Sequence, residues 1–209
     1  MSIYLDNAAS SCPKPSGVVD AVDQCLREWC ANPGRGAHRT AVAAARVIFQ
    51  TREKAARFLN VADSSNIIFT QNATDSLNTA MRGLLAPGDH VVSTTVEHNA
   101  VLRPLKVFTA EGVDVTLVPS DAAGLVDKDQ ILAAVRHSTK LVVLTHASNI
   151  TGAIQAIPEL SLALKERGVP LLVDAAQSAG TIPLDMEKMP VSMLACTGHK
   201  SLMGPQGVG

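Results

Sequence analysis

The stretch Ser192-Met-Leu-Ala-Cys-Thr-Gly-His-Lys-Ser-Leu-Met-Gly-Pro-Gln-Gly-Val-Gly209 joins a short apolar run to a glycine-rich loop. Residues 193–196 are apolar and predict a buried strand, and Lys200 lies in the loop that follows. A poorly solvated lysine loses its proton more easily and can attack a carbonyl to form a Schiff base. Most lysines after a strand are simply solvated, so the rest of the chain must decide the meaning of Lys200.

The composition is that of a globular protein with room for one large domain or two small ones. The chain has 209 residues, is 46% apolar and 18% charged, and carries a formal net charge of −1. This balance argues against nucleic acid or an anionic membrane as a partner, and the 3% aromatic content argues against base stacking. The sequence shows no signal peptide and no apolar run long enough to span a bilayer, so we expect a cytoplasmic protein.

The four cysteines predict no metal site. Cys12, Cys25, Cys30 and Cys196 form no C-x-x-C pair and have no histidine nearby at zinc-ligand spacing. We expect reduced thiols, with Cys25 and Cys30 on one helix and Cys196 buried in the last strand.

The first third of the chain predicts two helices. Ser16 is placed to cap the first, whose apolar face would comprise Val18, Val22, Leu26 and Trp29. A loop forced by Pro33 and two glycines covers residues 32–36, and a second, alanine-rich helix covers residues 40–59.

Strands and helices then alternate, which predicts an α/β fold around a largely parallel sheet. The predicted strands are nearly continuous apolar runs at residues 67–70, 91–95, 113–118, 141–145, 171–174 and 193–196. The predicted helices between them are residues 75–85, 99–111, 127–136 and 158–168.

Polar residues gather directly after these strands, where ligands bind in sheets of this kind. The segments are 72–75, 97–99, 146–149, 174–177 and 197–200. Thr74 precedes a predicted helix, so its hydroxyl and the free N–H groups of the first turn form an anion site or a plain helix cap. Asp174 ends an apolar strand and therefore needs a cation, either a protonated ring nitrogen of a ligand or an arginine elsewhere in the fold.

Three further residues of this set have both a binding and a structural interpretation. His98 offers a flat surface for an aromatic ligand, or is an ordinary loop histidine. Asn149 and Gln177 can donate to a phenolic oxygen, or bind backbone. A phosphate site, a carboxylate, two amides and a Schiff-base lysine at one sheet edge together describe a site for pyridoxal 5'-phosphate.

Motifs along the whole chain resemble the cysteine desulfurase family, whose members have the class V aminotransferase fold. They are Tyr4-Leu-Asp-Asn-Ala-Ala, Asn32-Pro-Gly-Arg-Gly-Ala-His38, Asn72-Ala-Thr-Asp, Glu97-His-Asn, Thr145-His-Ala-Ser-Asn-Ile-Thr-Gly152, Val173-Asp-Ala-Ala-Gln-Ser-Ala-Gly180 and Thr197-Gly-His-Lys. The resemblance implies the three-layer α/β/α large domain of a fold type I pyridoxal phosphate enzyme.

The resemblance also implies roles for individual residues. Lys200 would carry the cofactor as a Schiff base and move protons at the substrate's α-carbon, Asp174 would pair with the pyridine nitrogen, and His98 would stack on the ring. Phosphate would be held by the Ala73 backbone N–H, Thr74, Thr197 and His199, and the ring oxygen by Asn149 and Gln177.

The family removes sulfur from L-cysteine, giving L-alanine and a persulfide on an enzyme cysteine, and the resemblance implies a homodimer that passes sulfur to an acceptor protein. The family's persulfide cysteine and carboxylate-binding arginine would lie beyond Gly209, and none of the four cysteines matches that nucleophile. We therefore expect a fragment without the C-terminal small domain: residues 1–36 as an N-terminal segment packed on the active-site side, and residues 37–209 as an incomplete cofactor-binding domain.

Other functions remain open at this point. A selenocysteine lyase acting on L-selenocysteine, or another class V member, would share every motif. A non-catalytic α/β fragment is the alternative outside enzymes. A dinucleotide-binding interpretation is weak, because no G-x-G-x-x-G follows the first strand.

Overall fold

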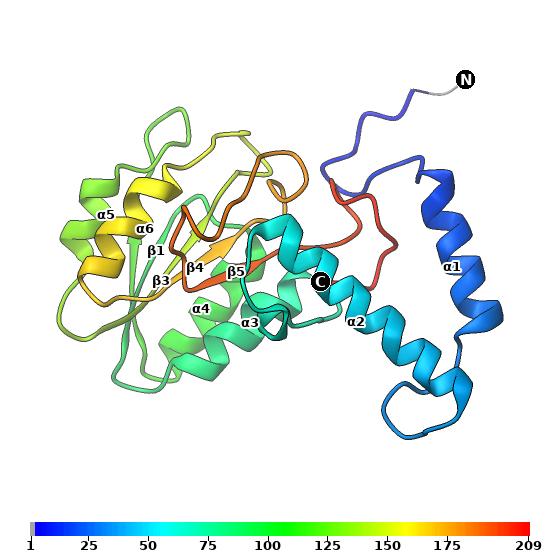
Figure 1. Ribbon diagram of the computed structural model, residues 1–209. Helices are drawn as coiled ribbons and strands as arrows, with labels where there is room; N and C mark the ends of the chain where they lie inside the picture. Colours follow the sequence, from blue (N-terminus) through cyan, green and yellow to red (C-terminus); the bar gives the residue numbers. More distant parts are fainter. Residues whose placement is uncertain (1–2) are drawn as a thin grey trace.

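A five-stranded parallel sheet with the order β2-β1-β3-β4-β5 is the centre of the computed structural model, which describes residues 3–209 (Figure 1). The strands are β1 (His90–Thr94), β2 (Asp114–Val118), β3 (Thr139–Thr145), β4 (Leu171–Asp174) and β5 (Met193–Ala195). Every neighbouring pair is parallel, which confirms the predicted sheet. The chain leaves β1 toward β2 on one side and returns to β3 on the other, so the topological switch lies between β1 and β3.

Helices cover both faces of this sheet and make the fold three-layered, as predicted. On one face lie α3 (Ala73–Leu84) and α4 (Asn99–Ala110), and on the other α5 (Lys128–Ala134) and α6 (Ile157–Glu166). Successive strand residues point to opposite faces: Val91 joins the apolar cluster under α3 and α4, and Val92 joins the one under α5 and α6. Both faces are therefore buried, and this explains the continuous apolar runs in the strands.

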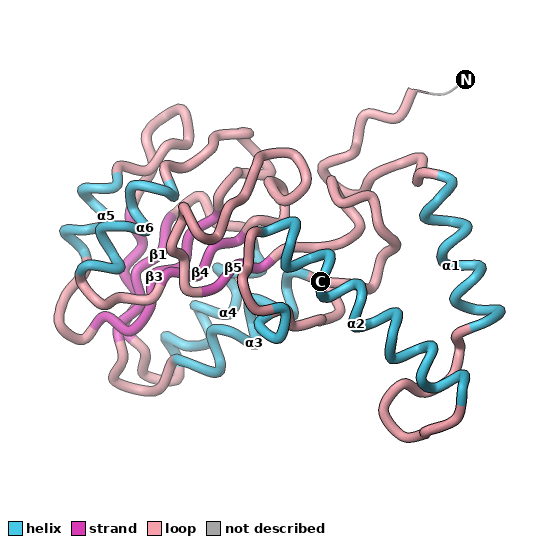
Figure 2. The backbone as a smooth tube through the Cα atoms, viewed as in Figure 1, coloured by secondary structure: helices cyan, strands magenta, loops and turns pink. Residues whose placement is uncertain are grey.

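Two N-terminal helices, α1 (Ser16–Glu28) and α2 (Arg39–Leu59), extend to one side of the sheet (Figure 2). The predicted Ser16 cap is wrong: Pro15 occupies the cap position, and no side chain caps the helix. No residue of α1 is buried, so its predicted apolar face packs against little of the described chain. No helix within residues 3–209 combines the length and apolarity needed to cross a membrane.

The predicted strand at residues 67–70 is absent from the sheet. A short 3₁₀ helix, η1 (Ser64–Asn66), comes first, and residues 67–70 then run without a ladder. Only Thr70 pairs, exchanging both backbone hydrogen bonds with Gly209 at 2.9 Å each, which is the pattern of an antiparallel pair. A groove of about 850 Å³ separates this segment from the edge strand β5, and an apolar segment cannot become a strand without an adjacent partner.

Some predicted boundaries are also corrected. The helix expected from Asp75 begins at Ala73, because the Asn72 side chain caps it by accepting from the Asp75 N–H at 2.9 Å. Since α1 ends at Glu28, Cys30 lies outside the helix that holds Cys25.

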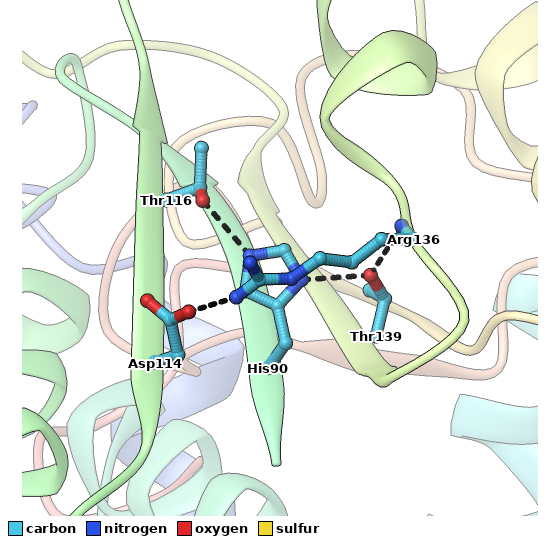
Figure 3. A network of polar contacts seen from close by, with 5 residues as sticks. All are labelled: His90, Asp114, Thr116, Arg136 and Thr139. Atoms are coloured by element: carbon cyan, nitrogen blue, oxygen red, sulfur yellow. Dashed lines mark hydrogen bonds and ion pairs between the residues drawn. The ribbon is translucent and has the colours of Figure 1, made fainter. Parts of the chain in front are cut away.

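The opposite end of the sheet carries a buried histidine that ties three strands together (Figure 3). The two ring nitrogens of His90 in β1 lie 2.8 Å from the hydroxyls of Thr139 in β3 and Thr116 in β2. An ion pair between Arg136 and Asp114 lies beside the ring. Burial lowers the pKa of His90 and Arg136 lowers it further, while Asp114 has the opposite effect, so the folded state favours the neutral ring.

This histidine makes stability depend on pH. As pH falls below 6.5, the ordinary pKa, the unfolded chain takes up a proton that folded His90 resists, so the free energy of unfolding falls by up to about 1.4 kcal/mol per pH unit. We expect His90→Gln to flatten this dependence in urea unfolding between about pH 5 and pH 7. His137→Gln, at an exposed position, is the control and should leave the slope unchanged. Equal slopes in both variants would contradict the assignment.

Candidate functional site

A pocket of about 180 Å³ lies at the carboxyl edge of the sheet, where the ends of β3, β4 and β5 meet the turns that begin α3 and α4. All nine predicted site residues line it: Ala73, Thr74, His98, Asn149, Asp174, Gln177, Thr197, His199 and Lys200. Parallel strands bring their carboxyl ends to one edge, which explains why residues so far apart in sequence converge here.

The first turn of α3 forms one wall of the pocket. The Asn72 side chain is bound to the Asp75 N–H, and the Asn72 carbonyl accepts from the Ser76 N–H at 3.0 Å. The N–H groups of Ala73 and Thr74 precede the first intrahelical bonds and, with the helix dipole, favour an anion. This wall can therefore hold a phosphate.

Asp174 lies at the end of β4 and is 4% exposed. Its Oδ1 accepts from the Ala176 N–H at 2.9 Å, and the carboxyl belongs to no ion pair within residues 3–209. The arginine partner considered from the sequence is therefore not present in the described chain. Burial raises the pKa of Asp174, while the Ala176 N–H, His98 and Lys200 act in the opposite direction.

Glu97, after β1, is a second buried carboxyl. Its Oε1 accepts from the Thr94 hydroxyl at 2.6 Å and from the Thr145 N–H at 3.0 Å, and its buried Oε2 has no hydrogen-bond partner among the described residues. Burial raises the pKa of Glu97 to about 8, and the charge of Asp174 contributes to the rise. Glu97 thus connects the turn that carries His98 to the end of β3. Its raised pKa keeps the carboxyl protonated at neutral pH, near Asp174.

Lys200 is half-buried in the loop after β5. Loss of solvation lowers the pKa of Lys200, and Asp174 partly opposes this shift. A larger fraction of its amine is therefore unprotonated at neutral pH, as attack on a carbonyl requires. The pKa of His199 is also lowered, by burial and by the charges of Lys200 and Lys14.

His98 is the N-cap of α4. Its Nδ1 accepts from the Ala100 N–H at 3.0 Å, so the neutral ring carries its proton on Nε2. The exposed ring lines the pocket from the β1 side.

Two predicted side chains are partly engaged by backbone. Gln177 Nε2 donates to the Ala8 carbonyl at 3.1 Å, which is the structural use of this amide that the sequence left open. The Thr197 hydroxyl donates to the Val208 carbonyl at 3.3 Å. Asn149 is exposed and borders the pocket.

The cysteines contribute no residue to the pocket lining. Cys196 follows β5 and is half-buried rather than buried; burial and the charge of Asp174 raise the pKa of its thiol. A raised pKa reduces the thiolate fraction and with it the nucleophilicity.

The roles of two groups that shape this site could not be predicted from the sequence. Glu97 belongs to the motif Glu97-His-Asn, but only the fold shows that its carboxyl is buried against Thr145. Ser11 and Lys14 contact the loop before Lys200, and no local signal indicates contacts across so much of the chain.

The fold and site together define an α/β protein with a ligand pocket at the carboxyl edge of a parallel sheet. The sequence profile of the family described as Aminotransferase class-V matches residues 3–209. The chain therefore belongs to the class V aminotransferase family.

Similar curated proteins include cysteine desulfurases. A probable cysteine desulfurase of Methanothermobacter thermautotrophicus is 39% identical over 208 residues, which are 99% of this chain and 52% of that protein. The cysteine desulfurase IscS of Vibrio atlanticus is 37% identical over 215 residues, covering 100% of this chain and 52% of the relative. The chain spans about half the length of the curated relatives it matches.

Solved structures agree with the fold. SspA in complex with cysteine superposes with a TM-score of 0.93 at 33% identity, over 100% of this chain and 60% of that one. The apo cysteine desulfurase from Thermococcus onnurineus NA1 gives a TM-score of 0.91 at 35% identity, over 99% of this chain and 52% of that one.

The proton on Glu97 predicts a second pH dependence of stability. Between pH 4.5 and about 8 the carboxyl ionises in the unfolded chain but stays protonated when folded, so the contribution of Glu97 to stability falls as pH rises through this window, opposite in sign to that of His90. We expect Glu97→Gln to remove up to about 1.4 kcal/mol per pH unit of this slope, measured by urea unfolding. Glu111→Gln, at an exposed position, should behave as the parent. The same pH slope in Glu97→Gln as in the parent chain would contradict the buried, protonated Glu97.

Proposed function

We propose that the chain is the cofactor-binding part of a pyridoxal 5'-phosphate-dependent cysteine desulfurase. The observation that carries the proposal is the convergence of all nine predicted residues on one pocket, around an Asp174 carboxyl that belongs to no ion pair in residues 3–209. Membership of the class V aminotransferase family supports it, because this family depends in general on pyridoxal phosphate.

The donor set fits the chemistry of this cofactor. A buried carboxylate without a cation is costly, and a protonated pyridine nitrogen would offset that cost at Asp174. The N–H groups of Ala73 and Thr74 at the start of α3 suit a phosphate. Lys200 supplies an amine with a lowered pKa that can bind an aldehyde covalently.

The remaining residues would orient the cofactor. His98 would stack on the ring, Thr197 and His199 would complete the phosphate site, and Asn149 and Gln177 would contact the ring oxygen. For Gln177 this contact would use the second N–H of its Nε2, since the first donates to the Ala8 carbonyl.

When bound, pyridoxal phosphate supplies an electron sink that stabilises a carbanion at the substrate's α-carbon. Asp174 would keep the ring nitrogen protonated, since the ion pair favours the cationic form of that nitrogen. Lys200, whose amine has a lowered pKa, would move the proton at the substrate's α-carbon. His98 can exchange a proton at Nε2, because the Ala100 N–H occupies Nδ1.

The reaction proposed for the whole protein converts L-cysteine and an enzyme thiol into L-alanine and an enzyme persulfide. The similarity to cysteine desulfurases supports this choice, as does the similarity to the solved structure of SspA in complex with cysteine. We do not assign the persulfide to Cys12, Cys25, Cys30 or Cys196. The thiol with the raised pKa, Cys196, is poorly suited to the role.

The organisation proposed for the protein follows from the resemblance. Residues 1–36 form a segment on the active-site side and residues 37–209 belong to the large domain. The protein acts in the cytoplasm as a homodimer and delivers sulfur to an acceptor protein.

The covalent role of Lys200 is testable on this chain. After addition of pyridoxal phosphate and borohydride reduction, peptide mass spectrometry should find a phosphopyridoxyl group on Lys200, with visible absorbance before reduction. Lys200→Ala should lose both signals, whereas Lys165→Ala, at an exposed position in α6, should keep them. Equal labelling and equal spectra in Lys200→Ala and the parent would refute the assignment.

A further inference from the structure

Several donors from residues 10–14 bind one backbone carbonyl, that of His199. The Ser11 N–H and hydroxyl each lie 3.0 Å from this oxygen, and the Lys14 ammonium lies 2.8 Å from it. The Ser10 hydroxyl is also within 3.3 Å. Lys14 Nζ donates in addition to the Ser11 hydroxyl at 2.7 Å, so the donors support one another.

This carbonyl belongs to the peptide group that leads into Lys200. Because the peptide unit is planar, holding the His199 oxygen also fixes the orientation of the Lys200 N–H and the position of the Lys200 Cα, from which the side chain leaves the backbone. The donor from Lys14 is charged, and charge-assisted hydrogen bonds are about twice as strong as neutral ones.

Hydrogen bonds within the loop that carries Lys200 engage further backbone groups on either side of His199. Gly198 N–H donates to the Val208 carbonyl at 2.9 Å, and Met203 N–H donates to the Lys200 carbonyl at 2.8 Å. On the far side the loop lies against Gly180, where an added Cβ would come within 2.8 Å of the Ser201 backbone. The loop is thus closely packed on one side, and the N-terminal segment supplies the restraint at His199.

We propose that Lys14, with Ser11, is a positioning residue for Lys200, and that docking of residues 3–14 on the rest of the chain is coupled to binding of the cofactor in the pocket. The inference rests on the proposed function. The hydrogen bonds that tie residues 3–14 to the rest of the described chain end on His199 and Gln177, and both of these residues line the pocket. A ligand that orders these two residues therefore stabilises the docked segment, and the docked segment strengthens ligand binding by the same factor.

Three variants separate a positioning role from general stabilisation. Lys14→Met removes the charged donor and keeps an unbranched chain, Lys14→Arg keeps a charged donor, and Ser11→Ala removes one hydroxyl. Lys188→Met is the matched control, because Lys188 is exposed and its ion pair with Asp185 lies outside the pocket lining.

The experiment uses the 209-residue chain with pyridoxal phosphate and has two readouts that do not need turnover. The first is the dissociation constant of the cofactor, by absorbance. The second is the rate at which an amine-acylating reagent modifies Lys200 in the cofactor-free chain, by peptide mass spectrometry. We expect Lys14→Met to weaken binding about tenfold and to change the acylation rate several-fold, while Lys14→Arg stays within about threefold of the parent. Ser11→Ala should give an intermediate loss, and Lys188→Met none.

Hydrogen exchange tests the coupling without substitutions. Loading the parent chain should slow amide exchange in residues 6–14, and this measurement also decides the question if Lys14→Met fails to fold. Parental affinity and acylation rate in Lys14→Met, or no protection of residues 6–14 on loading, would overturn the inference. Failure of the parent itself to carry cofactor on Lys200 would instead refute the proposed function, and the acylation rates would still test the role of Lys14.

Discussion

Two buried carboxyl groups without an ion-pair partner in residues 3–209 are the constraint on which this site depends. Glu97 follows β1 and Asp174 ends β4, on the two sides of β3, and burial raises the pKa of both. The pocket that Asp174 lines also contains an amine with a lowered pKa. Such an arrangement costs stability in the absence of a ligand, and a cationic ring with an anionic tail is the chemistry that would relieve it.

The sheet topology explains how these groups meet. The connection after β1 leads to β2 on one side, and the connection after β3 leads to β4 on the other. This leaves the carboxyl edge between β1 and β3 open for the turn that carries Glu97 and His98. The Glu97 carboxyl then joins the β1 turn to the backbone of Thr145 in β3. The N-terminal segment restrains the other side through the carbonyl before Lys200. The pocket is therefore built from rigid strand ends and is held from two directions.

The sequence predicted the sheet well because both of its faces are buried, so each strand is largely an apolar run, such as residues 171–173 before Asp174. The same property located the segments after the strands, and all nine residues that the family resemblance implied lie within these segments and line the pocket. Residues 67–70 show the limit of this reasoning: an apolar β-branched run has strand character, but only a neighbouring backbone makes a strand, and a groove lies there instead.

Contacts between residues far apart in the chain could not be predicted from the sequence, for a different physical reason. Nothing in the residues around Lys14 indicates which carbonyl its ammonium binds, since that carbonyl belongs to His199. In the same way, helical periodicity predicted an apolar face for α1, but periodicity does not tell whether a surface is available to cover it. The charge state of Glu97 depends on burial by the assembled fold, which its position in a motif does not convey.

The protonation state of the bound cofactor would show directly whether Asp174 is the partner of the ring nitrogen. Pyridoxal phosphate isotope-labelled at its ring nitrogen can be followed by NMR on the loaded chain as pH is raised from about 6 to about 9. We predict a protonated nitrogen throughout, because the buried Asp174 carboxylate stabilises the cation, and loss of that protonation in Asp174→Asn. An unprotonated ring nitrogen in the parent chain, or the same titration in Asp174→Asn, would contradict it.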